Sequence, residues 1–252
     1  MSKRCCLTIR QVGTDKQDAC RTIERTVINT SCKKGKGMLW MKTFYYRHRP
    51  HIQPPGATIF VTFRLHGSLP RKKIEELKEE YERLKELTSQ AILKGVKKQT
   101  YEKYYLKQKQ LIGKYDDYLH KSTTGPHYLK EKKIAQLVCS SIKYWDGTKY
   151  DLLAYTVMSN HVHIVFTPLN KEDGDYHSLE SIMHSIKSYT ATEANKILGR
   201  KGRPFWEHES FDHYSRSNEE TERIVQYVLY NPVKAGLVET WQEWPWSYFK
   251  FA

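Results

Sequence analysis

Four residues in the C-terminal half of the chain have the types and spacing of a site for phosphodiester chemistry. His161 and His163 lie one residue apart among β-branched residues, and Tyr227 precedes Asn231 by four residues. Side chains at i and i+2 share a face on a strand, and those at i and i+4 share a face on a helix. Two imidazoles and an amide oxygen can hold a divalent cation beside a phenol. This combination suits cleavage through a covalent bond between a tyrosine and a DNA phosphate.

The ligand types are compatible with more than one divalent cation. Magnesium prefers oxygen ligands, whereas imidazole favours manganese and other transition ions, so the sequence allows both Mg²⁺ and Mn²⁺. A tyrosine with a pKa of about 10 is a poor nucleophile at neutral pH. It can still attack a polarised phosphate when the phenol is held in line with the bond that breaks. Transfer to the phenol conserves the bond energy, so rejoining would need no ATP.

Each pair taken alone also has an ordinary structural explanation. Two half-exposed histidines on a polar sheet face would give the same His-x-His pattern, and Tyr227 is one of 18 tyrosines. Tyr230 is the alternative nucleophile, although its helical phase differs from that of Asn231 by one residue. The combination of both pairs in a basic chain favours the catalytic interpretation.

The elements expected around these residues form an α+β domain. Apolar periodicity predicts strands at 57–65, 150–158, 161–167 and 211–216, and helices at 129–144, 178–198 and 219–230. Asn218 is the expected N-cap of the last helix. The order matches a ferredoxin-like split β-α-β plan, an antiparallel sheet with helices on one face and an added C-terminal nucleophile helix. The histidine strand would be central, and the helix of Tyr227 could pack across the histidine face.

Two segments lie outside this plan. Residues 1–40 are basic and irregular, and we interpret them as a flexible basic leader before a catalytic domain at 41–252. Residues about 71–126 predict a charged helical insertion between the first strand and the helix that follows it. Its apolar stripe indicates an amphipathic helix with a solvated charged face, and a DNA-binding arm is the alternative.

The composition favours a nucleic-acid partner. The chain has 42 Lys+Arg against 28 Asp+Glu, a net charge of +14, although a solvated basic surface would give the same balance. Aromatic residues among cations suit single-stranded nucleic acid, whose bases stack on rings. Five cysteines without a Cys-x-x-Cys pair argue against a zinc knuckle or disulfide framework and favour a reducing cytoplasm. No apolar run predicts a membrane span or a signal peptide.

An ordered series of motifs runs along most of the organised chain. It comprises residues 56–65, 67–70, 158–163, 186–190, 205–206, 211–213, 231–238 and 244–248. The series resembles the REP-associated tyrosine transposases, a family of HUH single-strand nucleases related to the transposases of small insertion sequences. The resemblance covers residues 47–70 and 129–250.

The resemblance implies a ferredoxin-like domain that uses Mg²⁺ or Mn²⁺ to cleave and join single-stranded DNA near hairpin-forming palindromic repeats. Cleavage would give a 5′-phosphotyrosyl intermediate and a free 3′-OH. By motif match, His161 and His163 would be metal ligands, Asn231 the third ligand and Tyr227 the nucleophile. The long insertion leaves monomer or homodimer open, because related transposases can place their tyrosine helices in trans.

Several residues in or beside the motifs are candidate DNA contacts, and each could equally be a solvated surface group. Cations there would hold phosphates, which positions DNA rather than reads bases; a histidine and a tryptophan could stack or hydrogen-bond, with core packing the favoured role of Trp206. The candidates are Lys187, Arg203, His208, Arg216 and Lys234, together with Arg200 and Lys201. A DNA-binding protein that recognises repeat hairpins without cutting is the second function, and an RNA-binding protein is the third. The DNA functions go with a cytoplasmic, nucleoid-associated location of prokaryotic type.

Overall fold

A computed structural model describes the protein over residues 44–46, 50–52, 56–70, 72–77, 79–80, 83–84, 87, 98–215 and 217–252. By its contacts the chain divides between Trp40 and Met41, so these residues all belong to the second part. The expected leader at 1–40 and the candidate DNA contact Arg216 lie outside the described residues. Within the described ranges, none of the helices has both the length and the apolar character needed to cross a bilayer.

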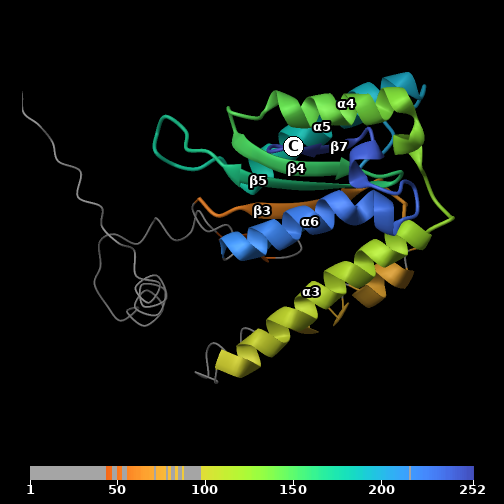
Figure 1. Ribbon diagram of the computed structural model, residues 1–252. Helices are drawn as coiled ribbons and strands as arrows, with labels where there is room; N and C mark the ends of the chain where they lie inside the picture. The colour runs from red at the N-terminus through yellow and green to blue at the C-terminus, as the bar shows by residue number, and fades with distance from the viewer. Residues whose placement is uncertain are drawn as a thin grey trace, which may run out of the picture. The chain divides into compact units, whose positions relative to one another are not determined.

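A five-stranded antiparallel sheet forms the centre of the domain (Figure 1). Its strands are β3 (Ile59–Arg64), β4 (Tyr150–Val157), β5 (His161–Pro168), β6 (Phe211–Tyr214) and β7 (Ser247–Phe249), in the order β6-β3-β5-β4-β7. β5 lies between β3 and β4 and runs antiparallel to both, which is the split β-α-β arrangement. The α+β, ferredoxin-like plan is therefore confirmed, with the histidine strand at its centre. A separate hairpin pairs β1 (Phe44–Tyr46) with β2 (Pro50–Ile52).

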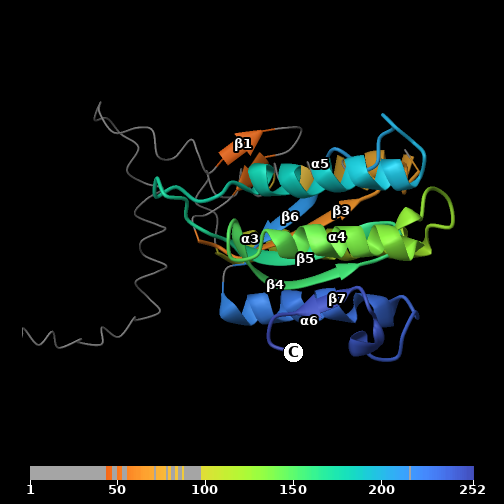
Figure 2. The ribbon, with the colours of Figure 1, turned by 90° about the horizontal axis from the view of Figure 1, so that it is seen from above.

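Two helices cover one face of this sheet. α4 (Lys132–Tyr144), preceded by the short 3-10 helix η2 (Tyr128–Lys130), packs beside α5 (Leu179–Ile197), as Figure 2 shows from above. The strands bury alternate residues against these helices, as a period of two requires. Those residues include Ile59, Val61, Phe63, Val162, Ile164 and Phe166. The predicted apolar face opposite the two histidines is therefore the main core.

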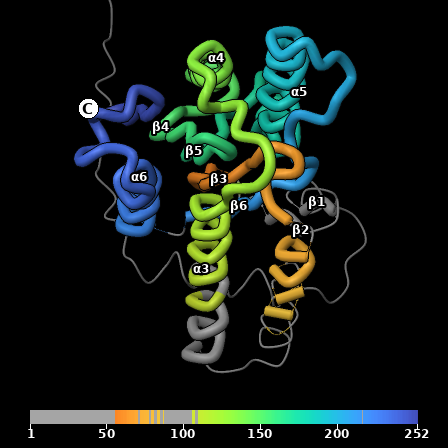
Figure 3. The backbone as a smooth tube through the Cα atoms, turned by 90° about the vertical axis from the view of Figure 1, so that its right-hand side faces the viewer, coloured from red at the N-terminus to blue at the C-terminus, as the bar shows by residue number. Residues whose placement is uncertain are grey.

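The opposite face of the sheet is covered by α6 (Asn218–Lys234). Val225 and Val228 of this helix pack against Phe60 and Val165 of the sheet. Figure 3 shows α4 and α5 on one side of the sheet and α6 and α3 on the other. The helix with Tyr227 thus crosses the face from which the histidines project, as the sequence predicts.

The two ends of α6 differ from the sequence prediction. The N-cap is Ser217 rather than Asn218, because the Ser217 side chain accepts a hydrogen bond from the backbone N–H of Glu220. The helix continues past the predicted end at residue 230 to Lys234, with Pro232 inside its last turn. Proline removes one backbone hydrogen bond from a helix, and this loss falls where the helix is about to end. The additional turn keeps Asn231 helical, one turn beyond Tyr227.

The predicted insertion is helical and packs against the sheet. Helical pieces at 72–77, 79–80 and 83–84 precede α3 (Lys98–Lys121). Leu77, Leu84 and Leu111 form a small apolar cluster, as the amphipathic pattern predicts. Ile112 also belongs to the apolar layer between α6 and the sheet. The sequence did not predict this contact between the insertion and the catalytic face.

The C-terminal segment adds an edge strand that the sequence also did not predict. After the short 3-10 helix η3 (Trp241–Glu243), β7 pairs with β4. The indole Nε1 of Trp244 donates to the carbonyl oxygen of Val157 at 3.0 Å. A three-residue strand is too short to show a period of two, so its pairing depends on the tertiary structure.

The two ends of the insertion meet where the chain leaves and re-enters the sheet domain. The Ser122 hydroxyl donates to the carbonyl oxygen of Ser68 at 3.0 Å. Gly125 has a φ of +94°, and a Cβ atom built on it would lie 2.4 Å from the carbonyl oxygen of Gly67. Only glycine fits this close approach.

We expect Gly125→Ala to lower the free energy of unfolding by about 1–3 kcal/mol. The substitution places a Cβ atom at a position with a left-handed backbone, where that atom would clash with the carbonyl oxygen of Gly67. Gly113→Ala is the matched control, since a Cβ atom at this α3 position meets nothing within 4 Å. The control should be neutral or stabilising by up to about 1 kcal/mol, because alanine favours helix. Urea unfolding measures both, and equal stability of the two variants would contradict the close approach.

Candidate metal and nucleophile site

His161 and His163 project together from β5 toward α6, as the strand spacing predicts. Both side chains are fully buried, and their ring centroids lie 4.7 Å apart. The ring of Phe60 stacks on His163 with a centroid distance of 5.7 Å. The pair is therefore an enclosed site and differs from two half-exposed residues on a polar face.

Each imidazole is held through its Nδ1 atom. Nδ1 of His161 lies 2.7 Å from Oδ1 of Asn160, whose Nδ2 donates to the Leu119 carbonyl oxygen at 3.0 Å. Because the amide oxygen can only accept, the His161 proton belongs on Nδ1. Nδ1 of His163 lies 2.8 Å from the Thr62 hydroxyl, which can accept in the same way. Both Nε2 atoms are buried without a hydrogen-bond partner, so their lone pairs are available to a ligand.

Burial also keeps the two imidazoles neutral. Removal from water lowers the pKa of His163 to about 3 and lowers the pKa of His161 well below its ordinary value. A neutral imidazole with a free ring nitrogen is the form that coordinates metal ions. The same burial would oppose any function that requires a protonated histidine here.

α6 brings Tyr227 and Asn231 to the histidines. The Tyr227 ring centroid lies 6.1 Å from the His163 centroid, and its hydroxyl donates to Oδ2 of Asp116. Asn231 is buried, and its Oδ1 atom has no hydrogen-bond partner. Tyr230, the alternative nucleophile, is 61% exposed.

Asp116 is a component of this site that the sequence analysis missed. It lies on α3, is fully buried, and places Oδ2 3.6 Å from Nε2 of His163. Ligand atoms of Asp116, His161 and His163 all lie within 4.8 Å of one another, so these residues could hold a metal ion. One signal was present in the sequence. Asp116 and His120 are two ligand types at i and i+4 of a predicted helix, and the His120 ring centroid lies 5.3 Å from that of His161.

The electrostatics of the site favour a cation. Burial raises the pKa of Asp116 to about 7, and burial together with the Asp116 carboxylate raises the pKa of Tyr227 above its ordinary value. Both shifts show that negative charge at this position lacks compensation. Within the site, the unpartnered buried atoms are Asp116 Oδ1, Asn231 Oδ1 and the Nε2 atoms of His120, His161 and His163. The two oxygens and the two nitrogens of the strand histidines fit Mn²⁺ or a similar divalent ion, and Mg²⁺ with added water.

Comparisons with known proteins identify the region that contains this site. Residues 127–231, which include His161, His163, Tyr227 and Asn231, match the family model described as Transposase IS200 like. The chain is similar to REP-associated tyrosine transposases over this region. A member from Escherichia coli K12 is 28% identical over 108 residues, and a Haemophilus influenzae protein assigned to the same family is 25% identical over 113 residues.

The extent of these matches is partial. They span 43% and 40% of this chain, and 59% of the length of each relative. A solved structure of a REP-associated tyrosine transposase bound to a REP hairpin aligns with 81% of this chain and 80% of that one. Its sequence identity to this chain is 17% and the TM-score is 0.43.

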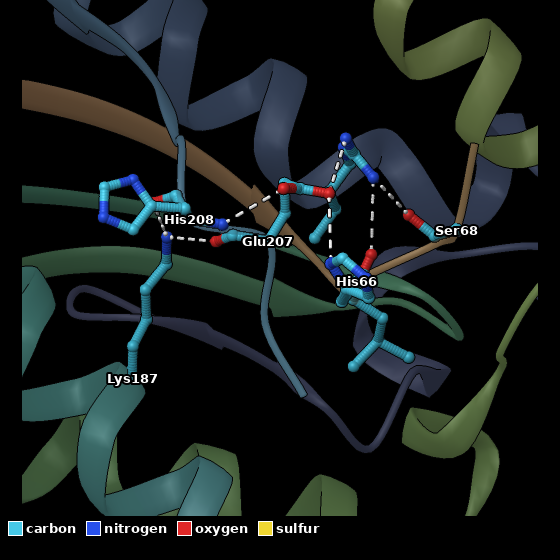
Figure 4. Close-up of polar contacts among 7 residues, drawn as sticks. His66, Ser68, Lys187, Glu207 and His208 are labelled. Atoms are coloured by element: carbon cyan, nitrogen blue, oxygen red, sulfur yellow. Dashed lines mark hydrogen bonds and ion pairs between the residues drawn. The ribbon is translucent and has the colours of Figure 1, made fainter. Parts of the chain in front are cut away.

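Three of the candidate DNA contacts, Lys187, His208 and Lys234, already have protein partners. Lys187 on α5 donates to the carbonyl oxygens of Glu207 and His208, at 2.9 and 3.1 Å (Figure 4). Lys234 pairs with Asp117 of α3, with 2.6 Å between Nζ and Oδ1. Arg203 and His208 are exposed. Trp206 is buried and donates to the Thr190 hydroxyl at 2.8 Å, so its core role is confirmed.

Glu207 links Lys187 to a buried cation on β3 (Figure 4). The Glu207 carboxylate lies 3.1 Å from the guanidinium of Arg64, which also donates to the Ser68 hydroxyl. Arg64 is almost fully buried, so this ion pair compensates its charge. The lysine thus anchors the backbone of a segment whose side chain neutralises Arg64.

We expect Lys187→Ala to lower the free energy of unfolding of the DNA-free protein by about 1–3 kcal/mol, because two hydrogen bonds to a charged donor are lost. Lys201→Ala is the control, since Lys201 is exposed in the turn after α5, and its effect should stay within about 0.5 kcal/mol. Chemical denaturation without DNA measures both. A DNA-only role for Lys187 would leave the two variants equally stable.

Proposed function

We propose that this protein is a metal-dependent, single-strand DNA endonuclease and strand transferase that forms a 5′-phosphotyrosine at Tyr227. One observation supports the proposal most directly. The Tyr227 hydroxyl and the free Nε2 atoms of His161 and His163 meet in one buried site. A purely structural role would leave such buried nitrogens without compensation for their lost hydration.

Residues of α6 and of the histidine strand would position the reacting groups in this reaction. The Tyr227 oxygen attacks phosphorus, the bond to the 3′ oxygen breaks, and the phenolic proton passes through solvent to the departing 3′ oxygen. His161, His163 and Asn231 would hold a divalent cation, which would supply Lewis-acid stabilisation of the charge on the phosphate. Packing of α6 against the sheet keeps the phenol in place. Attack by a 3′-OH on the phosphotyrosine reverses the first step and joins strands without ATP.

The proposed substrate is single-stranded DNA beside a repeat that forms a hairpin. Support comes from the net charge of +14 and from the similarity to relatives named as REP-associated tyrosine transposases. The exposed Arg203 and His208 are candidate contacts to that hairpin. The histidines, Tyr227 and Asn231 belong to one chain, so catalysis in cis is the simplest arrangement and a monomer would be sufficient.

We expect Tyr227→Phe to abolish the protein–DNA adduct while binding of hairpin DNA stays largely intact, because only the attacking oxygen is removed. Tyr230→Phe, one turn away and exposed, is the matched control and should form the adduct normally. The assay uses 5′- and 3′-labelled hairpin DNA from the flanks of the gene, with Mn²⁺, on denaturing gels. An adduct that Tyr227→Phe retains and Tyr230→Phe loses would identify Tyr230 as the nucleophile.

Replacement of both His161 and His163 by Ala should remove cleavage and its dependence on metal together, because the two nitrogen ligands are lost. Wild-type protein with EDTA gives the corresponding metal-free control. Undiminished cleavage by the double variant would refute the metal assignment. Wild-type protein that binds DNA hairpins without any adduct would instead support the non-cutting regulator, and a preference for RNA hairpins would support the third function.

A further inference from the structure

We propose that Asp116 of the inserted helix α3 is a fourth protein ligand of the metal site and that it fixes the Tyr227 phenol beside the metal. This inference rests on the proposed function and extends it to a residue outside the matched family region at 127–231. It assigns an active-site role to an insertion that the sequence alone presents as a charged surface helix.

The two carboxylate oxygens of Asp116 differ in their contacts. Oδ2 accepts the hydrogen bond of the Tyr227 hydroxyl and lies 3.6 Å from Nε2 of His163. Oδ1 is buried and has no hydrogen-bond partner. One oxygen therefore orients the nucleophile, and the other is free to coordinate an ion. A carboxylate in this position places the phenol next to the cation.

The position of Asp116 is costly unless a cation is nearby. A carboxylate without a compensating charge is strongly disfavoured in a protein interior. Among the residues that the structure describes, no lysine or arginine forms an ion pair with Asp116. Lys234 of α6, whose positive charge also acts on Asp116, forms its ion pair with the neighbouring Asp117. In the described part of the chain Asp116 therefore has no lysine or arginine in direct contact, and a divalent cation would supply that charge.

The contact between α3 and the rest of the site is specific. Lys234 and Asp117 connect α3 to the end of α6, and Asn160 connects His161 to the Leu119 carbonyl oxygen of α3. Both bonds lie within three residues after Asp116 on its own helix. With Asp116 added, the ligand set has two nitrogens and two oxygens and leaves coordination positions for phosphate and water.

The test measures Mn²⁺ binding by the full-length, DNA-free protein, with electron paramagnetic resonance reporting the free ion. Asp116→Asn keeps the size and an acceptor for the Tyr227 hydroxyl, and it should weaken Mn²⁺ binding by about tenfold or more. Asp117→Asn is the matched control, one residue away and half exposed. Its affinity should stay within about twofold, since its carboxylate pairs with Lys234.

Two further readouts separate a ligand from a structural residue. The visible spectrum of bound Co²⁺ should change in Asp116→Asn and stay unchanged in Asp117→Asn, because it reports the ligands directly. Asp116→Glu should recover part of the affinity that Asp116→Asn loses. Metal-free unfolding should show Asp116→Asn at least as stable as wild type, because a buried charge is removed.

Each outcome has a distinct meaning. Equal Mn²⁺ affinity and an unchanged Co²⁺ spectrum in Asp116→Asn would overturn the role of Asp116 and leave the proposed function standing. Equal losses in Asp116→Asn and Asp117→Asn would also overturn it, because they would indicate a general effect of the charge of α3. A wild-type protein that binds neither ion would overturn both the inference and the proposed metal chemistry.

Discussion

The structure depends on one constraint, the burial of polar ligand atoms between the sheet and α6. Unpartnered nitrogens and oxygens in a protein interior cost free energy, so the surrounding contacts must hold them in place. Asn160 and Thr62 hold the two imidazoles by Nδ1, and the apolar contacts of α6 hold Tyr227 and Asn231. The unpartnered atoms of this site lower the stability of the fold, and a bound cation would provide their missing partner.

The position of the histidine strand follows from the same constraint. β5 is the middle strand of five, so both of its edges are paired and its backbone is rigid. Its apolar residues face the large core under α4 and α5, while His161 and His163 face the smaller layer under α6. The alternation of a strand thus separates the residues that stabilise the domain from those that could do chemistry.

The parts of the site that follow a local period could be predicted from the sequence, whereas those that depend on distant contacts could not. His161 with His163 and Tyr227 with Asn231 are pairs within single elements, and the strand order follows from the run of elements. Asp116 reaches the site only because α3 folds back onto the sheet. β7 and the role of Lys187 in holding the Glu207 backbone likewise depend on tertiary contacts. The Ser217 cap was missed because Ser and Asn are comparable N-cap residues.

The hydrogen bond that joins the two ends of the insertion affects how the length of the insertion can vary. Ser68 and Ser122 are hydrogen-bonded although 54 positions separate them, so for the sheet domain the whole insertion is a closed loop. Loop-closure entropy grows slowly, by about 0.6 kcal/mol for each doubling of length, so the outer part can lengthen or shorten at little cost. Between Asp116 and Ser122 a change of length is not tolerated in the same way. One residue added or removed there would turn the carboxylate by about 100° around α3, so only changes near whole helical turns would leave it facing the histidines.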